Sequence, residues 1–401
     1  MTTTRRRTLG AGVLVGTAVV VTALNLRPAV VGVSPLIPRI QADLAMSAPV
    51  AGLISTSSVV CFGLLAPAAP ALARRIGLEA AIVVGLAVLG VGVAVRLFPQ
   101  AGWLFVGAVL AGAGIAVCNT LIPAVVKRDF PHRLGLMTGL YSGTLNLGAG
   151  LAAALAVPVA TATDSWRFSL AVWLVPVVLA LAGWVAVRRH WQRPPRPAEV
   201  VPGEVPAPTA KLTRSPLAWF VTLYLAAQSF EFYASAAWIP TLFIDAGISR
   251  EEAGVLLGFS NVIGLAAAIV APTLAGRRRS QSGAIVVVVV VYAVGLSGLG
   301  FAPAAAPWLW VTVFGVAQGA GFALGLLMVA VRAPDVAIAT RLSGMSQCYS
   351  YVIAATGPFV YGLVHDVSGG WAWPIGVGLA MLVPMLVFGV LGGRDRVVGR
   401  A

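Results

Sequence analysis

The chain has 401 residues, of which 59% are hydrophobic and 10% are charged, and its formal net charge is +14. An ordinary soluble domain carries roughly 25% charged residues, so this composition excludes a water-soluble globular protein of this size. The basic residues stand between apolar stretches instead of lining one groove, which excludes a nucleic-acid-binding surface.

Twelve apolar stretches of membrane-spanning length follow one another along the chain. A bilayer core about 30 Å thick is crossed by roughly 20 apolar residues of helix, because each residue rises about 1.5 Å. We therefore predict an all-α membrane protein with twelve transmembrane helices. The expected spans are residues 9–36, 49–73, 80–97, 103–126, 134–160, 168–187, 217–244, 253–275, 284–301, 308–331, 342–364 and 372–391.

The basic residues predict how the chain crosses the membrane. If the N-terminus is cytoplasmic, all but five of the 27 Lys and Arg residues fall on the cytoplasmic side, as the positive-inside rule requires. We expect a multi-pass protein of the cell (plasma) membrane with both termini in the cytoplasm. The five exceptions are Arg27, Arg39, Arg96, Arg167 and Arg250.

Neither a cleaved leader nor a cofactor is expected. Arginines at 5–7 precede an apolar run as in a signal peptide, but the run lacks a convincing small-residue cleavage site and eleven more spans follow it. Cys61, Cys118 and Cys348 lie singly in apolar segments, without the spacing of a disulfide or metal site. We assign these thiols to packing.

One long polar interval, residues 188–216, interrupts the hydrophobic pattern and is rich in Pro, Arg and Glu. Such a segment is typical of an extended linker. It divides the chain into two pseudo-symmetric six-helix halves, residues 1–187 and 217–401. The loop ALARRIGLE of the first half has a counterpart in LAGRRRSQSG of the second. Parallel repeats of this kind are typical of transporters that rock one half against the other.

Arg27 is one of two ionisable residues singled out as strong candidates within the apolar spans, where charges are costly and mark functional sites. One interpretation is that its side chain reaches the outer surface or pairs with a helix end. The other is that it binds an anion or couples transport in a central cavity. Its permanent charge and planar donor fork suit a small anion or a carboxylate.

Glu231 is the second ionisable residue, in the seventh span. It is either a carrier of the coupling proton or a static partner of Arg27, and both hypotheses stay open. The residues that share its helical face are polar or aromatic, namely Tyr224, Gln228, Ser235 and Trp238.

Uncharged polar residues are scattered over several other spans. They are expected either to bind a small polar solute or to join helices by hydrogen bonds, and their spread over both halves favours a shared polar cavity. They are Asn119, Thr138, Tyr141, Ser142, Asn146, Gln318, Ser343, Gln347 and Ser350.

Charged residues between spans are candidates for a gate on the cytoplasmic side. Arg74 and Arg75 follow the second span, and Lys127, Arg128 and Asp129 follow the fourth. They are expected to latch the inner gate, or else to set topology alone.

At these positions the chain resembles the major facilitator superfamily, and within it the cyanate permease and 2-nitroimidazole transporter group. The resemblance covers nearly the whole chain. The segments that carry it are ALNLRPAVVGVSPLIPRIQADL, CFGLLAPAAPALARRIGLE, NTLIPAVVKRDFP, GLMTGLYSGTLNLGAG, AAQSFEFYASAAWIPTLFIDAGISREEAG and LSGMSQCYSYVIAATGPFVYGLVHDVSGGW.

This resemblance implies a monomer that works by alternating access and moves a small solute, driven by a proton gradient. By position, Arg27, Gln228, Trp238 and Gln347 would face the solute. The chain also departs from the pattern. The loop after the second span lacks the usual acidic residue, the fifth span lacks a Gly-Pro pair, and Glu231 stands where the group more often has an apolar residue.

Three other classes of protein are weighed against a carrier. The histidines at 132, 190 and 365 are isolated from one another, which argues against a membrane-embedded enzyme. The chain lacks a repeated pore loop, which argues against a channel, and lacks a phosphate-binding glycine loop, which argues against ATP hydrolysis. Within carriers, cyanate-like or nitroimidazole-like solutes, drug efflux, and the direction of transport all remain open.

Overall fold

The computed structural model describes residues 2–46, 48–190 and 212–399, and every regular element in them is helical. The all-α prediction is therefore confirmed. The elements are α1 (Thr2–Asn25), α2 (Pro28–Val31), η1 (Ser34–Leu36), α3 (Ile37–Leu44), α4 (Ala48–Leu65), α5 (Ala68–Ile76), α6 (Leu78–Ala94), η2 (Val95–Leu97), α7 (Ala101–Asp129), η3 (Pro131–Arg133), α8 (Leu134–Ala162), α9 (Trp166–Ala171), α10 (Leu174–His190), η4 (Leu212–Arg214), α11 (Pro216–Asp245), α12 (Arg250–Ala275), α13 (Ser282–Phe301), α14 (Pro307–Arg332), α15 (Val336–Ala354), α16 (Gly357–Ser368) and α17 (Ala372–Gly392).

Nine helical segments of the described chain are long and apolar enough to cross a membrane, and a tenth is the pair α4 and α5, bent by 58°. The twelve expected spans also include α11 and the pair α15 and α16. Neither is among the nine: α11 carries Gln228 and Glu231 in its middle, and α15 carries Arg341 and Gln347. Much of the predicted linker, residues 191–211, lies outside the described residues.

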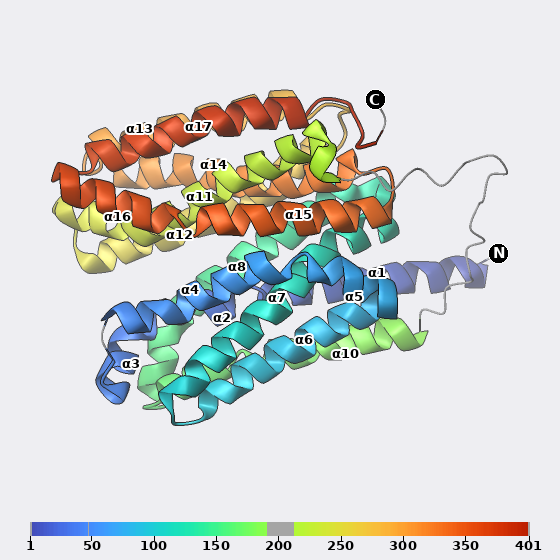
Figure 1. Cartoon of the computed structure of the whole chain (residues 1–401), viewed down its shortest axis with the longest axis horizontal. Helices are drawn as coiled ribbons and strands as arrows, with labels where there is room; N and C mark the ends of the chain where they lie inside the picture. Colours follow the sequence, from blue (N-terminus) through green and yellow to red (C-terminus); the bar gives the residue numbers. More distant parts are fainter. Residues whose placement is uncertain (1, 47, 191–211, 400–401) are drawn as a thin grey trace.

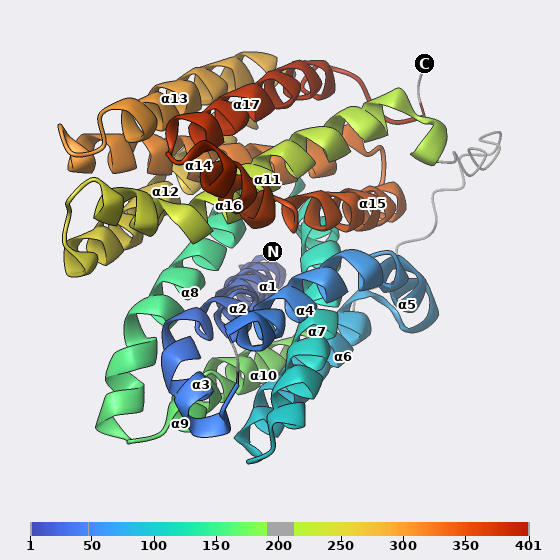
Figure 2. The same ribbon diagram turned by 60° about the vertical axis from the view of Figure 1, so that its left-hand side comes forward.

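The helices form two groups that face each other (Figures 1 and 2). We call α1–α10 the N-terminal group and α11–α17 the C-terminal group. Both chain ends lie toward the same end of the bundle in Figure 1, which we call the terminal end. The opposite end, where α3 and α16 lie, is the far end.

Prolines break three of the predicted spans. α1 ends at Asn25 and α2 begins at Pro28, α4 gives way to α5 around Pro67, and α16 begins with Gly357 and Pro358. Proline has no backbone N–H and clashes with the preceding turn, so a helix ends or bends before it. The break in the first span places Arg27 between the end of α1 and the short helix α2.

The two groups pack together near the terminal end. Gly135 and Gly139 of α8 lie very close to α12. A Cβ added at Gly135 would stand 2.2 Å from the Pro272 carbonyl oxygen, and one added at Gly139 would stand 2.8 Å from the Ile269 Cα. Lys127 Nζ, at the end of α7, donates to the carbonyl of Ala330 at 2.7 Å and to that of Ala333 at 2.5 Å. A lysine of one group therefore caps the C-terminal end of α14 in the other.

Candidate functional site

The Arg27 guanidinium lies where the two groups meet. Its Nη1 donates to Asn146 Oδ1 of α8 at 3.1 Å. The Phe232 ring of α11 and the Phe322 ring of α14 stand 4.3 Å and 5.2 Å from its Cζ. Both rings attract the cation through their π faces. No carboxylate forms an ion pair with Arg27 in the described part of the chain, so its charge is available to an anion.

A second arginine positions the short helix that follows Arg27. Arg96 is 2% exposed, and its Nη1 donates to the carbonyl of Ala29 in α2 at 2.6 Å. Its Nε and Nη2 have no hydrogen-bond partner. A buried guanidinium that holds a backbone carbonyl fixes α2 against η2 and so fixes the segment that carries Arg27.

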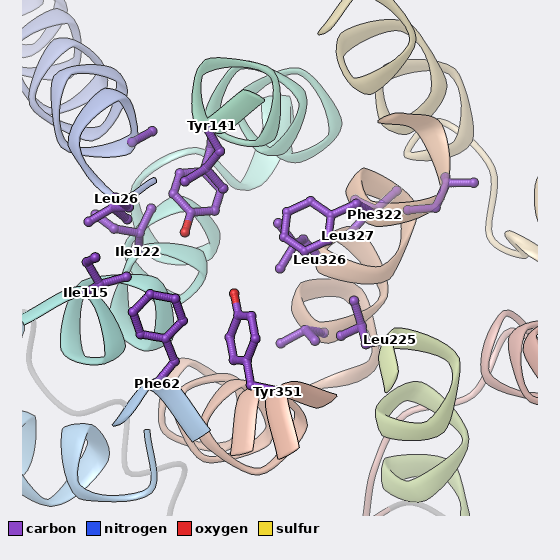
Figure 3. Packing of buried hydrophobic residues seen from close by; sticks show 14 of the residues in the cluster. Leu26, Phe62, Ile115, Ile122, Tyr141, Leu225, Phe322, Leu326, Leu327 and Tyr351 are labelled. Carbon is purple, nitrogen blue, oxygen red and sulfur yellow. The ribbon is translucent and has the colours of Figure 1, made fainter. Parts of the chain in front are cut away.

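Tyrosine hydroxyls and an asparagine amide lie beside Arg27. Tyr141 donates to Asn119 Oδ1 at 2.7 Å, and Asn119 Nδ2 makes a longer contact of 3.5 Å with the Tyr351 hydroxyl. In Figure 3 the two hydroxyls point toward one another, and Phe322 faces the same space. The guanidinium interacts electrostatically with both hydroxyls. The structure thus brings together Arg27, Asn119 and Tyr141 from the expected solute-facing set.

The other members of that set lie elsewhere. Gln347 is buried on α15, one turn before Tyr351. Gln228 lies inside the C-terminal group, where its Nε2 makes a long contact of 3.4 Å with the Gln318 carbonyl. Trp238 lies nearer the far end of α11, donates to the carbonyl of Pro358 at 2.8 Å and stacks beside His365.

Glu231 and Phe232 are adjacent in sequence and face different parts of the molecule. Phe232 covers the Arg27 guanidinium, whereas Glu231 is fully buried within the C-terminal group. Its Oε2 accepts a hydrogen bond from the Tyr361 hydroxyl at 3.3 Å. The structure does not bring Glu231 and Arg27 together as a pair.

The expected gate residues take different places. Arg74 and Arg75 are exposed in the last turn of α5. Asp129 bonds to its neighbour Arg128, which also reaches Glu79 at 2.7 Å. Lys127, two residues before Asp129, donates hydrogen bonds across to the C-terminal group.

Several residues of the site were not singled out from the sequence. Phe232 and Phe322 carry no pattern that separates them from other aromatic residues near apolar segments. Arg96 had a signal, because it is one of the five basic residues outside the cytoplasmic set and falls in the expected span 80–97. Asn146 had a signal, because it is a polar residue at helical spacing from Ser142 in an apolar span. Its role as the hydrogen-bond acceptor for Arg27 emerges only from the packing of α8 beside the helix break.

The fold and the site define a membrane carrier built from two helical groups around a central cation. The sequence profile of the Major Facilitator Superfamily matches residues 13–358, and the chain belongs to that superfamily. It is a transporter and not an enzyme. A solved structure of the proton:xylose symporter XylE has the same fold, with a TM-score of 0.79 over 98% of each chain at 13% identity.

The chain is also similar to curated bacterial transporters over most of its length. It is 35% identical to the 2-nitroimidazole transporter of Escherichia coli, covering 93% of this chain and 94% of that protein. It is 34% identical to the uncharacterized transporter YycB of Bacillus subtilis, and the match covers 95% of this chain and 94% of that protein. It is 30% identical to the cyanate transport protein CynX of Escherichia coli, and the match covers 88% of this chain and 90% of that protein.

Proposed function

We propose that this secondary transporter carries a small anionic or planar polar solute across the cell membrane, and that a proton gradient drives it. The observation that carries the proposal is the Arg27 guanidinium, which bonds to Asn146 and is flanked by Phe232 and Phe322. A cation without a carboxylate partner attracts negative charge, and two aromatic faces accept a flat solute.

Two relatives support this choice of solute. One is named for cyanate, a small anion, and another for 2-nitroimidazole, a planar ring. The Arg27 charge suits the first, and the rings of Phe232 and Phe322 suit the second. The same aromatic surroundings also suit an exported drug or metabolite of planar shape, which is the alternative function.

We propose that the two helical groups are the rocking halves and that the terminal end faces the cytoplasm. The basic residues near that end support this orientation through the positive-inside rule. The contacts at Lys127 and Gly139 join the groups at the terminal end. On this view the structure represents a monomer that is closed toward the cytoplasm, and the solute reaches Arg27 from the far end.

The test is uptake into proteoliposomes of labelled cyanate and, separately, of 2-nitroimidazole, with and without an inward proton gradient. Arg27→Ala removes the only charge proposed to meet the solute, so uptake of an anionic solute falls about 100-fold, because losing a desolvated charge contact costs roughly 2–5 kcal/mol. Arg39→Ala, at an exposed arginine of α3, is the matched control.

Gradient-driven, saturable uptake that Arg27→Ala removes and Arg39→Ala preserves supports the proposal. Equal uptake by Arg27→Ala and the wild type removes Arg27 from the solute site. Absence of uptake of both solutes by folded wild-type protein withdraws these two solute classes.

A further inference from the structure

The C-terminal group encloses a carboxylate that the solute site does not use. The Glu231 side chain is fully buried, and its Oε1 has no hydrogen-bond partner within residues 2–46, 48–190 and 212–399. Its Oε2 has a single long contact, with the Tyr361 hydroxyl at 3.3 Å. An ionised carboxylate in such surroundings lacks both the cation and the donors that normally repay its desolvation.

Two more buried polar side chains lie close to this carboxylate. Gln228 precedes Glu231 by one helical turn, and among the described residues its Oε1 has no donor. Tyr292 of α13 interacts electrostatically with Glu231, and its hydroxyl lies beside the Gln318 side chain. The Glu231, Gln228 and Tyr292 side chains are all fully buried. Glu231 Oε1 and Gln228 Oε1 are therefore two buried acceptors for which the described residues supply no donor.

The helices around Glu231 supply no charge to balance it. α16 presents the Tyr361 hydroxyl and α13 presents the Tyr292 hydroxyl. α14 supplies the Gln318 carbonyl, which faces the Gln228 amide. α17 supplies Gly378, where an added Cβ would lie 3.2 Å from Glu231 Oε2 and closer still to the Tyr361 hydroxyl. Among the described residues no Lys, Arg or His forms an ion pair with Glu231.

We infer that Glu231, Gln228, Tyr292 and Tyr361 form a proton-binding site inside the C-terminal group, separate from the Arg27 site. The inference rests on the proton coupling proposed above and says where the proton binds. A proton on Glu231 Oε1 neutralises the carboxyl and turns one acceptor into the missing donor. Release of the proton to water leaves a carboxylate. This carboxylate needs further hydrogen-bond donors, which water or a rearrangement of the side chains around Glu231 must supply.

The site is connected to a helix that a break separates from the preceding one. Tyr361 belongs to α16, which is separated from α15 by the break at Ala355 and Thr356. Trp238 of α11 donates to the carbonyl of Pro358 in the same helix. A change in the Glu231 charge therefore acts directly on the position of α16, at the far end of the C-terminal group, rather than by direct contact with Arg27.

Protonation of Glu231 is measured by infrared difference spectroscopy. Spectra of purified full-length protein are compared between acid and alkaline pH, in sodium-free buffer. The wild type is expected to lose a protonated-carboxyl band as the pH rises, and Glu231→Gln is expected to lack that band. Tyr361→Phe removes the one donor to the carboxylate, so the proton is expected to bind about tenfold more tightly. Tyr349→Phe, at an exposed tyrosine of the same group, is the control and leaves the titration unchanged.

A carboxyl band that Glu231→Gln leaves intact overturns the inference. A band that added sodium ions remove at constant pH also overturns it, because the oxygen cluster then takes a metal cation. If Glu231→Gln does not fold, the difference between Tyr361→Phe and Tyr349→Phe decides, and equal titrations count against the site.

Transport separates this inference from the proposed function. Glu231→Gln is expected to retain solute exchange at equal concentrations and to lose accumulation driven by a proton gradient. Unchanged gradient-driven accumulation in that variant overturns the inference even where Arg27→Ala has confirmed the solute site. Conversely, a wild type that moves neither tested solute leaves the infrared result standing.

Discussion

The two helical groups are alike at the far end and opposite at the centre. In the N-terminal group, Trp166 at the start of α9 donates its indole N–H to Asp43 Oδ2 at 3.0 Å. In the C-terminal group, Trp371 beside α17 donates to Asp245 Oδ2 at 2.9 Å. Each aspartate follows the group's first span and each tryptophan precedes its sixth, so the two groups share one hydrogen-bonded Trp–Asp pair, which we call the clasp.

The centres differ in the sign of their buried charge. The N-terminal group holds Arg27 and Arg96 near the break in its first span. The C-terminal group holds Glu231 at the middle of its corresponding helix. The two groups therefore share a Trp–Asp contact and differ in the charged residues at their centres. The difference favours a division of labour in which one group supplies the charge for the solute and the other the site for the proton.

Arg96→Met tests whether the two centres act independently, and it is expected to have the largest effect on solute uptake among the tests that follow. The change leaves the Ala29 carbonyl without its donor in a buried position, which costs roughly 1–3 kcal/mol. We expect α2 to loosen and solute uptake to fall about tenfold, because Arg27 no longer has a fixed position. The measurement is solute uptake and thermal unfolding of purified protein, with Arg39→Met as the exposed control.

The Glu231 infrared band is expected to stay unchanged in Arg96→Met, because the carboxylate lies in the other group. A tenfold loss of uptake together with loss of that band would break the comparison, since it would show that the two centres act as one unit. Uptake within twofold of the wild type would show that Arg96 does not position Arg27.

Gly139→Ala tests how the two groups meet. The added methyl group would lie 2.8 Å from the Ile269 Cα in α12, so the helices must separate, at a cost of roughly 1–3 kcal/mol. We expect the population closed at the terminal end to fall several-fold. Gly150→Ala on the same helix is the matched control, because no atom lies within 4 Å of its added Cβ.

The measurement is the distance distribution between spin labels at Arg75 and Arg278, which are exposed residues of the two groups. Gly139→Ala is expected to add longer distances and Gly150→Ala to leave the distribution as in the wild type. Identical distributions for both variants would mean that the close approach of α8 and α12 does not hold the terminal end closed.

The sequence predicted the helical membrane fold because backbone groups inside a bilayer must bond within helices, and this leaves long apolar runs. It also singled out Arg27 and Glu231, because charges are rare in such runs. It did not predict that Glu231 and Phe232 face opposite surroundings, since the rotation of α11 depends on its neighbours.

The charged loops show the same limit of sequence reasoning. Arg74 and Arg75 stand in a recognisable loop motif, yet they are exposed, whereas Lys127 of the other loop bonds across to the C-terminal group. Its acceptors are two backbone carbonyls at the end of α14, and a backbone acceptor has no sequence signature. The aromatic faces around Arg27 come from two distant helices and likewise depend on tertiary packing.

The smallest expected effect concerns the clasp that the two groups share. Hydrogen bonds from Trp166 and then Arg167 lower the pKa of Asp43 below its usual value near 3.8, and partial burial opposes them. A carboxyl whose pKa is lower in the folded protein stabilises it above the unfolded pKa, and this contribution is lost as the pH falls through the folded pKa. Because Asp43 is exposed, the contribution is below about 1 kcal/mol.

Hydrogen exchange of α3 and α9, corrected for intrinsic rates, is expected to increase slightly between pH 6 and about pH 3 in the wild type, since Asp43 has a reference pKa near 3.8. Asp43→Asn keeps an oxygen that accepts the Trp166 indole N–H but cannot titrate, so its exchange is expected to stay level. An equal acid-induced rise in both proteins would assign the change to other carboxylates. It would also show that the clasp joins the spans by its neutral hydrogen bond, which is the feature that Asp245 and Trp371 reproduce in the C-terminal group.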